Sequence, residues 1–309
     1  MSGPPGPTDF GVDRFTVPAV LDRRAEQYPD CVMMSIAGAD VTFEQMRQRS
    51  RAAARMLAEL GVGSGDCVAL YTATCPEWVY FWLGEARIGA LSAAVNAADK
   101  GDFLLHNLRV ARAKVVVTDA ERRPRVEEIA GQLDAATDVL VQDDSLSSTL
   151  ARGGDGPDNP TGPDELGSLF FTSGTTGPSK AVATTWHYLF TVAATVASAW
   201  EFGPGEVVWS AMPLFHLSAA PTVLAPMLVG GTTVLAEAFH PTRCGTTCAP
   251  TAPSASPAHG RWFRCCRTCP RIRATRSCRC GSSPRRPSTQ RPTATSRSGM
   301  AVASSRCTG

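Results

Sequence analysis

The sequence predicts an α/β fold in which mostly parallel strands are covered by helices. Short apolar runs of strand length alternate with longer segments of helical periodicity between residues 16 and 236. The short runs are apolar at consecutive positions, which is typical of strands buried on both faces of a sheet. Glycine and proline stand where the helical segments begin and end, as expected for helices joined to strands by short turns.

The first elements follow from periodicity and from end signals. Residues 17–28 carry apolar side chains at helical spacing, and the pattern stops at Pro29. Residues 31–36 are a short apolar run that suits a strand. The helix predicted over residues 43–60 is rich in Ala, Arg, Leu, Met and Gln, and Gly61 follows it in the place of a C-terminal cap.

The middle of the chain continues the alternation of strands and helices. In chain order, the segments are the strand 67–71, the helix 76–88, the strand 91–95, the helix 102–111, the strand 114–118 and a charged helix that begins at residue 120. His106 is expected on the solvated face of its helix. Strands that alternate with helices of this length favour a parallel sheet.

Composition divides the chain into three parts. We expect a flexible N-terminus at residues 1–14, a globular body at 15–242, and a disordered tail rich in Arg, Cys, Pro and Ser at 243–309. Within the body, residues 143–165 are rich in Pro, Gly and Asp and predict an exposed loop between two sheet units.

Charge and cysteine follow the same division. The part before residue 243 contains 17 Lys and Arg and all 28 Asp and Glu, so its formal net charge is −11. The tail contains 13 Arg and no acidic residue. Eight of the 11 Cys also lie in the tail. The N-terminus has no apolar stretch of signal-peptide type, so a cytoplasmic location with reduced thiols is predicted. No membrane span is expected, because prolines and a glycine pair interrupt the apolar segment 212–236.

One segment combines the features of a phosphate-binding loop. An apolar strand leads into a loop of hydroxyls and glycines, followed by a lysine and a predicted helix over 185–200. Glycines allow a tight turn with bare N–H groups, hydroxyls add donors, and the lysine adds charge close to the helix N-terminus. The spacing is not that of a Walker A loop. The predicted phosphate-binding residues are Thr172, Ser173, Gly174, Thr175, Thr176, Gly177 and Lys180.

This segment resembles the phosphate-binding signature of the AMP-forming adenylating superfamily, which includes acyl-CoA synthetases, luciferases and peptide-synthetase adenylation domains. The usual form has proline just before the lysine and glycine just after it, whereas this chain has Ser179 and Ala181 there and Pro178 one place earlier. Other stretches resemble family elements in the expected order, namely Thr42–Met46, Gly65–Ala69, Gly89–Ala90 with Val95–Asn96, and Met212–His216.

The resemblance implies the N-terminal large domain of an acyl-CoA synthetase and its reaction. A small-molecule carboxylic acid would attack the α-phosphate of ATP to give an acyl-adenylate and pyrophosphate, and CoA would then accept the acyl group. ATP, Mg²⁺ and CoA are the implied cofactors. In the family, the Met212–His216 motif lines the acyl and nucleotide pocket, so Phe215 and His216 are assigned to it. The form of that motif leans toward fatty-acid or crotonobetaine/carnitine-type CoA ligases.

The family pattern is not continued in the tail. The elements that would supply the magnesium glutamate, the ribose aspartate and the adenylation lysine are not found there. We therefore expect no complete catalytic set, no metal site and impaired activity in this chain. The alternatives are a catalytically inactive remnant and a nucleotide-binding fragment with a basic tail.

Three interpretations of the tail remain open. A zinc module would use Cys266 and Cys269 with Cys278 and Cys280, and His259 as a further candidate ligand, but the second cysteine pair has the wrong spacing. A nucleic-acid-binding arm would use the arginines, yet lysine is absent from the tail and aromatics are few, so no nucleic-acid partner is expected. The favoured interpretation is a shifted reading frame in GC-rich DNA, since its composition matches out-of-frame translation.

Overall fold

The computed structural model describes residues 3–36, 38–133, 137–158, 162–172, 178–236, 257–258 and 261–262. The chain divides into one unit at Met1–Cys278 and a second at Arg279–Gly309, and every described residue belongs to the first. Most of the tail lies outside the described residues. This holds for all of its cysteines and for all of its arginines except Arg261.

A six-stranded sheet, here called the large sheet, carries the order β6-β5-β3-β4-β7-β8. All neighbouring pairs are parallel except β7 and β8, which are antiparallel. The strands are β3 (Cys67–Tyr71), β4 (Leu91–Ala94), β5 (Ala113–Asp119), β6 (Asp138–Gln142), β7 (Leu166–Thr172) and β8 (Lys180–Thr185).

A four-stranded sheet, here called the small sheet, carries the order β2-β1-β10-β9. Its strands are parallel except for the β1–β2 pair. They are β1 (Val32–Ile36), β2 (Ala39–Thr42), β9 (Val207–Ser210) and β10 (Thr232–Leu235). A further antiparallel pair joins β11 (Pro257–Ala258) and β12 (Arg261–Trp262). The predicted α/β class with mostly parallel strands is thus confirmed.

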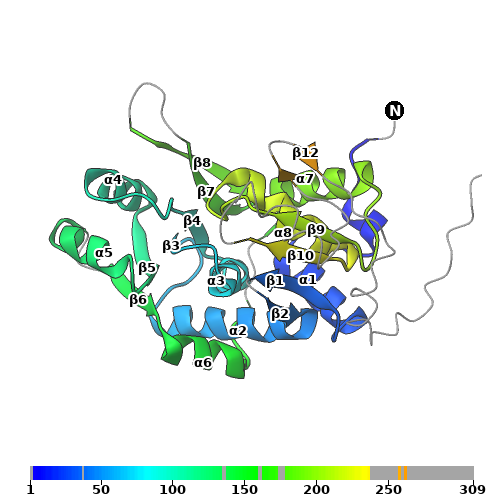
Figure 1. Cartoon of the computed structure of the whole chain (residues 1–309), viewed down its shortest axis with the longest axis horizontal. Helices are drawn as coiled ribbons and strands as arrows, with labels where there is room; N and C mark the ends of the chain where they lie inside the picture. The colour runs from blue at the N-terminus through cyan, green and yellow to red at the C-terminus, as the bar shows by residue number, and fades with distance from the viewer. Residues whose placement is uncertain are drawn as a thin grey trace, which may run out of the picture. The chain divides into compact units, whose positions relative to one another are not determined.

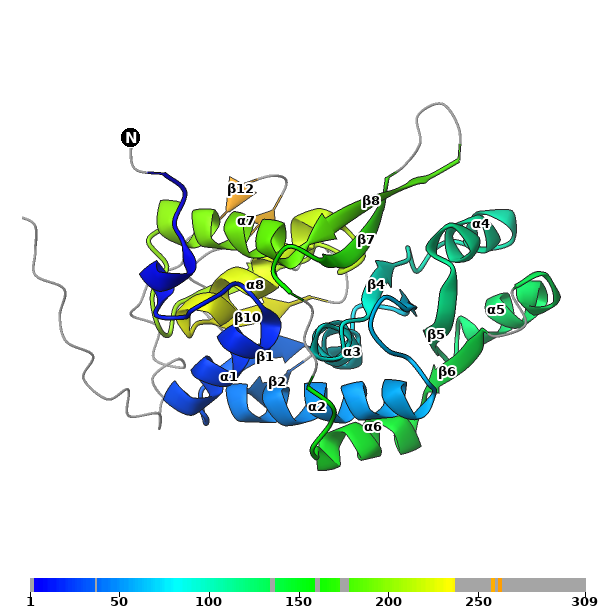
Figure 2. The same cartoon turned by 180° about the vertical axis from the view of Figure 1, so that it is seen from behind.

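Eight helices and three short 3₁₀ turns complete the described part of the chain (Figures 1 and 2). The helices are α1 (Val17–Gln27), α2 (Phe43–Glu59), α3 (Pro76–Arg87), α4 (Asp102–Ala111), α5 (Arg123–Ile129), α6 (Asp144–Arg152), α7 (Trp186–Ala199) and α8 (Ala220–Val229). The 3₁₀ turns are η1 (Pro7–Phe10), η2 (Ala130–Gln132) and η3 (Leu217–Ala219).

The helix ends follow the signals in the sequence. Thr42 and Gln45 form a reciprocal capping box at the start of α2. Gly61, just past the other end of that helix, has a φ of 76°, a left-handed conformation in which glycine has no steric cost. No helix among the described residues is both long enough and apolar enough to cross a membrane.

One continuous apolar core joins the two sheets. It contains Met34 and Val208 of the small sheet together with Val68 and Val115 of the large sheet. Side chains of α2, α3, α7 and α8 fill the space between them. A separate cluster on the other face of the large sheet packs under α4 and α5. The large sheet therefore has helices on both faces, as its apolar strands predict.

The prediction of an exposed loop over 143–165 is wrong for its first part, where α6 forms. Asp143 caps this helix, because its carboxylate accepts a hydrogen bond from the backbone N–H of Leu146 at 2.8 Å. Leu146 and Leu150, one turn apart, are buried in the core that joins the sheets. Two leucines at helical spacing thus outweigh the polar composition of the segment.

The segment after Lys180 also differs from the prediction. Residues 180–185 form the strand β8, which was not predicted, and pair with β7; the following helix begins at Trp186, within one residue of the predicted start at 185. Thr185 caps that helix by accepting a hydrogen bond from the N–H of Tyr188 at 3.1 Å. The predicted closeness of Lys180 to the helix N-terminus is therefore wrong. Lys180 begins β8, and the extended residues of this strand, which are hydrogen-bonded to β7, separate it from the start of the helix.

Candidate functional site

Thr172 and Lys180 lie opposite each other where β7 ends and β8 begins, at the connecting end of the β7–β8 hairpin. They are register partners, and the Thr172 hydroxyl donates to the carbonyl oxygen of Lys180 at 3.3 Å. The structure thus brings together the first and last of the predicted phosphate-binding residues. The others, namely Ser173, Gly174, Thr175, Thr176 and Gly177, lie outside the described residues.

This hairpin end lies at the edge of the large sheet where the parallel strands finish. Strand β7 runs parallel to β4, with Ala94 opposite Phe170, so Thr172 lies beyond the carboxyl end of β4. The same edge carries the carboxyl ends of β3 and β5. Ligands of open α/β sheets bind outside the carboxyl ends of the strands. The hairpin end is therefore well placed for a ligand.

The base of the hairpin is anchored to α3 and α7. The Trp82 indole N–H donates to the Ser168 hydroxyl at 2.9 Å, and the Thr184 hydroxyl donates to the Ser168 carbonyl oxygen at 3.0 Å. All three residues are buried. Gly167 allows close packing, since a Cβ there would lie 2.6 Å from the indole nitrogen of Trp186. The hairpin thus starts from a rigid base.

The arm of the hairpin just before Lys180 contacts α4. The Ser179 hydroxyl donates a short hydrogen bond to Oδ1 of Asn107, and Nε2 of His106 lies 2.9 Å from the Ser179 carbonyl oxygen. Asn107 in turn donates from Nδ2 to the carboxylate of Asp99 at 2.8 Å. His106 was expected on the solvated face of this helix, but it is half-buried, because the fold brings the hairpin against α4.

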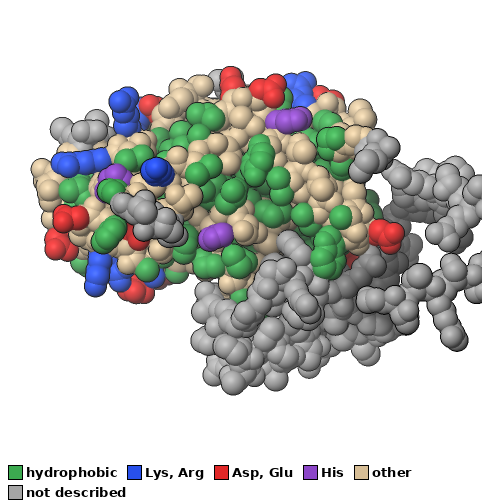
Figure 3. All heavy atoms as spheres, turned by 90° about the horizontal axis from the view of Figure 1, so that it is seen from above, with side chains coloured by type: hydrophobic (Ala, Val, Ile, Leu, Met, Phe, Trp, Pro, Cys, Tyr) green, Lys and Arg blue, Asp and Glu red, His purple; other side chains and the backbone are tan. Residues whose placement is uncertain are grey.

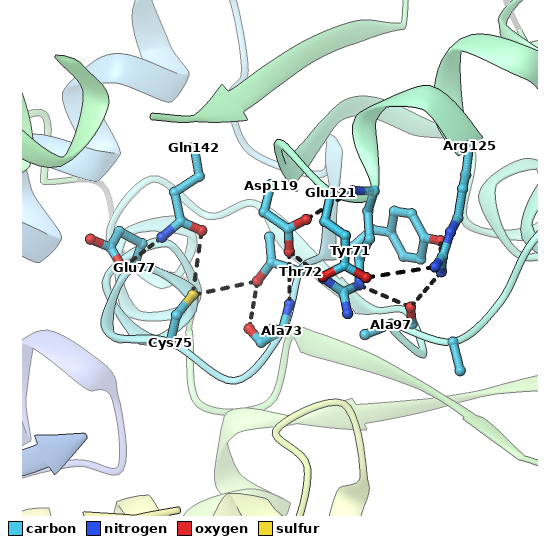
Figure 4. Close-up of polar contacts among 12 residues, drawn as sticks. Tyr71, Thr72, Ala73, Cys75, Glu77, Ala97, Asp119, Glu121, Arg125 and Gln142 are labelled. Atoms are coloured by element: carbon cyan, nitrogen blue, oxygen red, sulfur yellow. Dashed lines mark hydrogen bonds and ion pairs between the residues drawn. The ribbon is translucent and has the colours of Figure 1, made fainter. Parts of the chain in front are cut away.

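Further polar side chains gather along the same sheet edge (Figure 4). The guanidinium of Arg125 donates to the carbonyl oxygen of Ala97 at 3.1 Å and to the Tyr71 hydroxyl at 3.4 Å. The Asp119 carboxylate accepts from the N–H of Ala73 at 3.1 Å. Burial raises the pKa of Tyr71, against an opposing effect of the Arg125 hydrogen bond. These contacts join the end of β3 and the loops after β3 and β4 to the end of β5 and to α5.

Cys75, in the loop after β3, is engaged in hydrogen bonds at this edge (Figure 4). Its Sγ donates to Oε1 of Gln142 at 3.4 Å, and the same Gln142 donates from Nε2 to Glu77 at 2.8 Å. Burial raises the pKa of the Cys75 thiol. Since the thiolate is the reactive form, this cysteine is suited to a structural role.

Phe215 and His216 lie in the loop after β9, on the small sheet. Phe215 packs against the core that joins the sheets, next to the buried Leu214. His216 accepts, at Nδ1, a hydrogen bond of 3.2 Å from the N–H of Ser218 and so caps η3. That Phe215 and His216 line one pocket together with Thr172 and Lys180 stays a prediction.

The face seen from above carries many hydrophobic side chains at its centre and charged ones toward its ends (Figure 3). On the hairpin and the helix that follows it, the exposed large hydrophobic side chains are Leu166, Val182 and Tyr188. Of these, Val182 lies two residues after Lys180 in β8, whereas Leu166 lies at the opposite end of the hairpin.

Fold and site together describe an α/β protein with a hydroxyl- and lysine-bearing hairpin at the carboxyl edge of a parallel sheet. The model of the family "AMP-binding enzyme" matches residues 21–291. The chain belongs to this AMP-binding enzyme family. The match extends past residue 242, where the sequence pattern predicts the end of the family-like body, so that boundary stays a prediction.

Known proteins with similar sequences are CoA ligases. The 4-coumarate–CoA ligase 3 of Oryza sativa subsp. japonica is 30% identical over 216 residues, which are 66% of this chain and 38% of that protein. The crotonobetaine/carnitine–CoA ligase of Shigella dysenteriae serotype 1 is 32% identical over 217 residues, 64% of this chain and 41% of that protein. The chain thus spans about 40% of the length of these relatives.

A solved structure has the same fold. The Mycobacterium tuberculosis fatty acyl CoA synthetase superposes with a TM-score of 0.72 at 23% identity, over 78% of this chain and 49% of that protein. At this identity the likeness concerns the fold. It agrees with the predicted architecture of the N-terminal part of an acyl-CoA synthetase.

Proposed function

We propose that the described body is the nucleotide-binding part of an ATP-dependent acid–CoA ligase. In this reaction a carboxylic acid is converted to an acyl-adenylate and then to an acyl-CoA. The observation that carries the proposal is the pairing of Thr172 with Lys180 at the carboxyl edge of the large sheet. They flank a segment of hydroxyls and glycines in a chain of the AMP-binding enzyme family.

Lys180 is suited to hold a phosphate. Its side chain is exposed, and within the described ranges no carboxylate forms an ion pair with it. An ammonium without a protein counter-ion keeps its full attraction for a phosphate oxygen. We assign Lys180, with the hydroxyls and backbone N–H groups of residues 172–177, to the β- and γ-phosphates of ATP, where they would stabilise the departing pyrophosphate.

The other participants in the proposed reaction are Mg²⁺, the acid and CoA. Mg²⁺ would enter with the triphosphate, because phosphate oxygens are its usual ligands in such sites. In the described part of the chain, no three His, Cys, Asp or Glu side chains are grouped to hold a metal ion, so no protein ligand is assigned. Phe215 and His216 are proposed to line the acid pocket, and CoA is proposed as the acyl acceptor.

The class of acid follows from the relatives by analogy. Their names give 4-coumarate in one case and crotonobetaine or carnitine in the other. All of these are small molecules with one carboxylate to activate. We propose a substrate of that general class, a small-molecule carboxylic acid.

Nucleotide binding by the full chain tests the proposal. A fluorescent ATP analogue with Mg²⁺ should bind, and Lys180→Ala should weaken binding about tenfold or more, since a hydrogen bond to a charged group contributes roughly 1.5–3 kcal/mol. Arg152→Ala removes an exposed cation at the end of α6 and serves as the matched control. Equal affinities of the wild type and Lys180→Ala would refute the assignment of Lys180.

Pyrophosphate release separates the two candidate functions. Acid-dependent release that exceeds that of Lys180→Ala means that the chain itself activates the acid. Binding of the nucleotide without such release favours the nucleotide-binding fragment.

A further inference from the structure

The contact between Ser179 and α4 lies next to the lysine that the proposed function requires. Two interactions hold Ser179, one through its hydroxyl to Asn107 and one through its carbonyl oxygen to His106. They join residues more than 70 positions apart in the chain. Lys180 follows directly as the first residue of β8. A restraint on Ser179 is therefore a restraint on the backbone of Lys180.

Asn107 is built to receive this hydroxyl. Asn107 is only 2% exposed, and its Nδ2 is held in place by the hydrogen bond that it donates to the Asp99 carboxylate. A carboxylate only accepts hydrogen bonds, so the amide nitrogen must face Asp99 and Oδ1 must face Ser179. Asp99 is fixed in turn, because its carbonyl oxygen accepts the Tyr71 hydroxyl. Burial raises the pKa of Asp99, and the hydrogen bond from Asn107 opposes this rise.

The serine occupies a position where the family's usual motif has proline. Proline would fix φ at about −65° and thereby stiffen the residue before the lysine. Ser179 lacks this covalent restraint, and Pro178 stiffens the chain one place earlier. The hydrogen bonds to Asn107 and His106 supply a restraint at the same residue by another means. A proline at position 179 would lack the hydroxyl whose hydrogen bond Asn107 accepts.

We propose that Asn107 and His106 are positioning residues, which hold Ser179 against α4 and so fix Lys180 for binding the phosphates of ATP. This proposal rests on the function proposed above. It assigns a role to α4, a helix that carries none of the predicted site residues. A chain of contacts thus runs from Asp99 to Asn107 and from Asn107 to Ser179, which is bonded directly to Lys180.

The first test measures the restraint without any nucleotide. Trypsin cleaves after Lys180, which is exposed, so its cleavage rate in the full chain reports how firmly this backbone is held. Ser179→Ala and Asn107→Ala should each accelerate cleavage at Lys180 about three- to tenfold, as expected for one lost hydrogen bond. The double variant should be no faster than the faster single variant, and Ser179→Thr, which keeps the hydroxyl, should match the wild type.

The second test links the restraint to binding. Ser179→Ala should raise the Kd of the fluorescent ATP analogue about three- to tenfold, for the same reason. In a Lys180→Ala background the same change should have no effect, because the restraint acts through the lysine. Ser179→Ala leaves the buried residues intact and so keeps the test valid if Asn107→Ala fails to fold.

The two proposals fail in different ways. Unchanged trypsin cleavage in both Ser179→Ala, which removes the contact to Asn107, and His106→Ala, which removes the contact to the Ser179 carbonyl oxygen, would overturn the restraint itself. Faster cleavage with an unchanged Kd would overturn its role in positioning Lys180. A wild-type chain that binds no nucleotide would overturn the proposed function, while the cleavage rates would still report on the restraint.

Discussion

The β7–β8 hairpin and the segment 212–216 both carry predicted site residues, but different contacts hold them in place. Buried polar side chains anchor the hairpin, including Trp82 to Ser168. The segment 212–216 is anchored mainly by the apolar Leu214 and Phe215, with local hydrogen bonds such as that from the N–H of His216 to the carbonyl oxygen of Pro213 at 2.9 Å. Directional bonds fix where a group lies, whereas apolar contacts chiefly contribute stability.

The largest effect on stability is expected from Leu214→Ala. This side chain is 4% exposed within the core that joins the sheets. Its truncation should lower the free energy of unfolding by about 2–5 kcal/mol, as for other buried leucines. Urea denaturation measures the change, with the half-exposed Leu166→Ala as control. Equal losses in the two variants would mean that Leu214 is no anchor and would remove the contrast between the two regions.

A smaller loss is expected from Gly167→Ala at the base of the hairpin. The new methyl group would lie 2.6 Å from the Trp186 indole nitrogen, and that ring is itself packed between Trp82 and Phe190. Overpacking of this kind should lower the free energy of unfolding by about 1–3 kcal/mol. Gly203→Ala is the matched control, because nothing lies within 4 Å of its Cβ position. A neutral Gly167→Ala would show that the hairpin base is loosely packed.

The smallest effect is expected from His216→Ala. The change removes the acceptor for the N–H of Ser218 at the start of η3. The free energy of unfolding should fall by about 1 kcal/mol or less, as for a lost cap. His216→Asn, which keeps a side-chain acceptor, should recover most of it. A loss as large as that of Leu214→Ala would mean that a directional contact, and not apolar burial, holds this segment.

Local signals in the sequence predicted most of the described helices well. The pattern over 43–60 predicts α2 to within one residue, because the segment is rich in helix-forming residues and Gly61 marks its end. The helix over 102–111 has the predicted bounds. The helix α6 was missed, since glycines and aspartates nearby obscured the spacing of its two leucines. Composition is a weaker guide than the positions of a few buried side chains.

The candidate site was predicted in its residue types but not in its geometry. The order of strand, hydroxyls, glycines and lysine predicts a phosphate-binding segment from local chemistry alone. That Lys180 begins a strand depends on the pairing of β8 with β7, which periodicity does not reveal in so short a run. Edge strands of this kind are decided by their neighbours.

By itself, the sequence determined the class of fold, the order of its elements and the resemblance to adenylating enzymes, because these follow from local patterns. Only the tertiary structure decided what supports the lysine. The crossover from β4 through α4 to β5 carries α4 to the hairpin, and so His106 and Asn107 meet Ser179. Such contacts between distant residues arise from the path of the chain through the sheet, which no short stretch of sequence encodes.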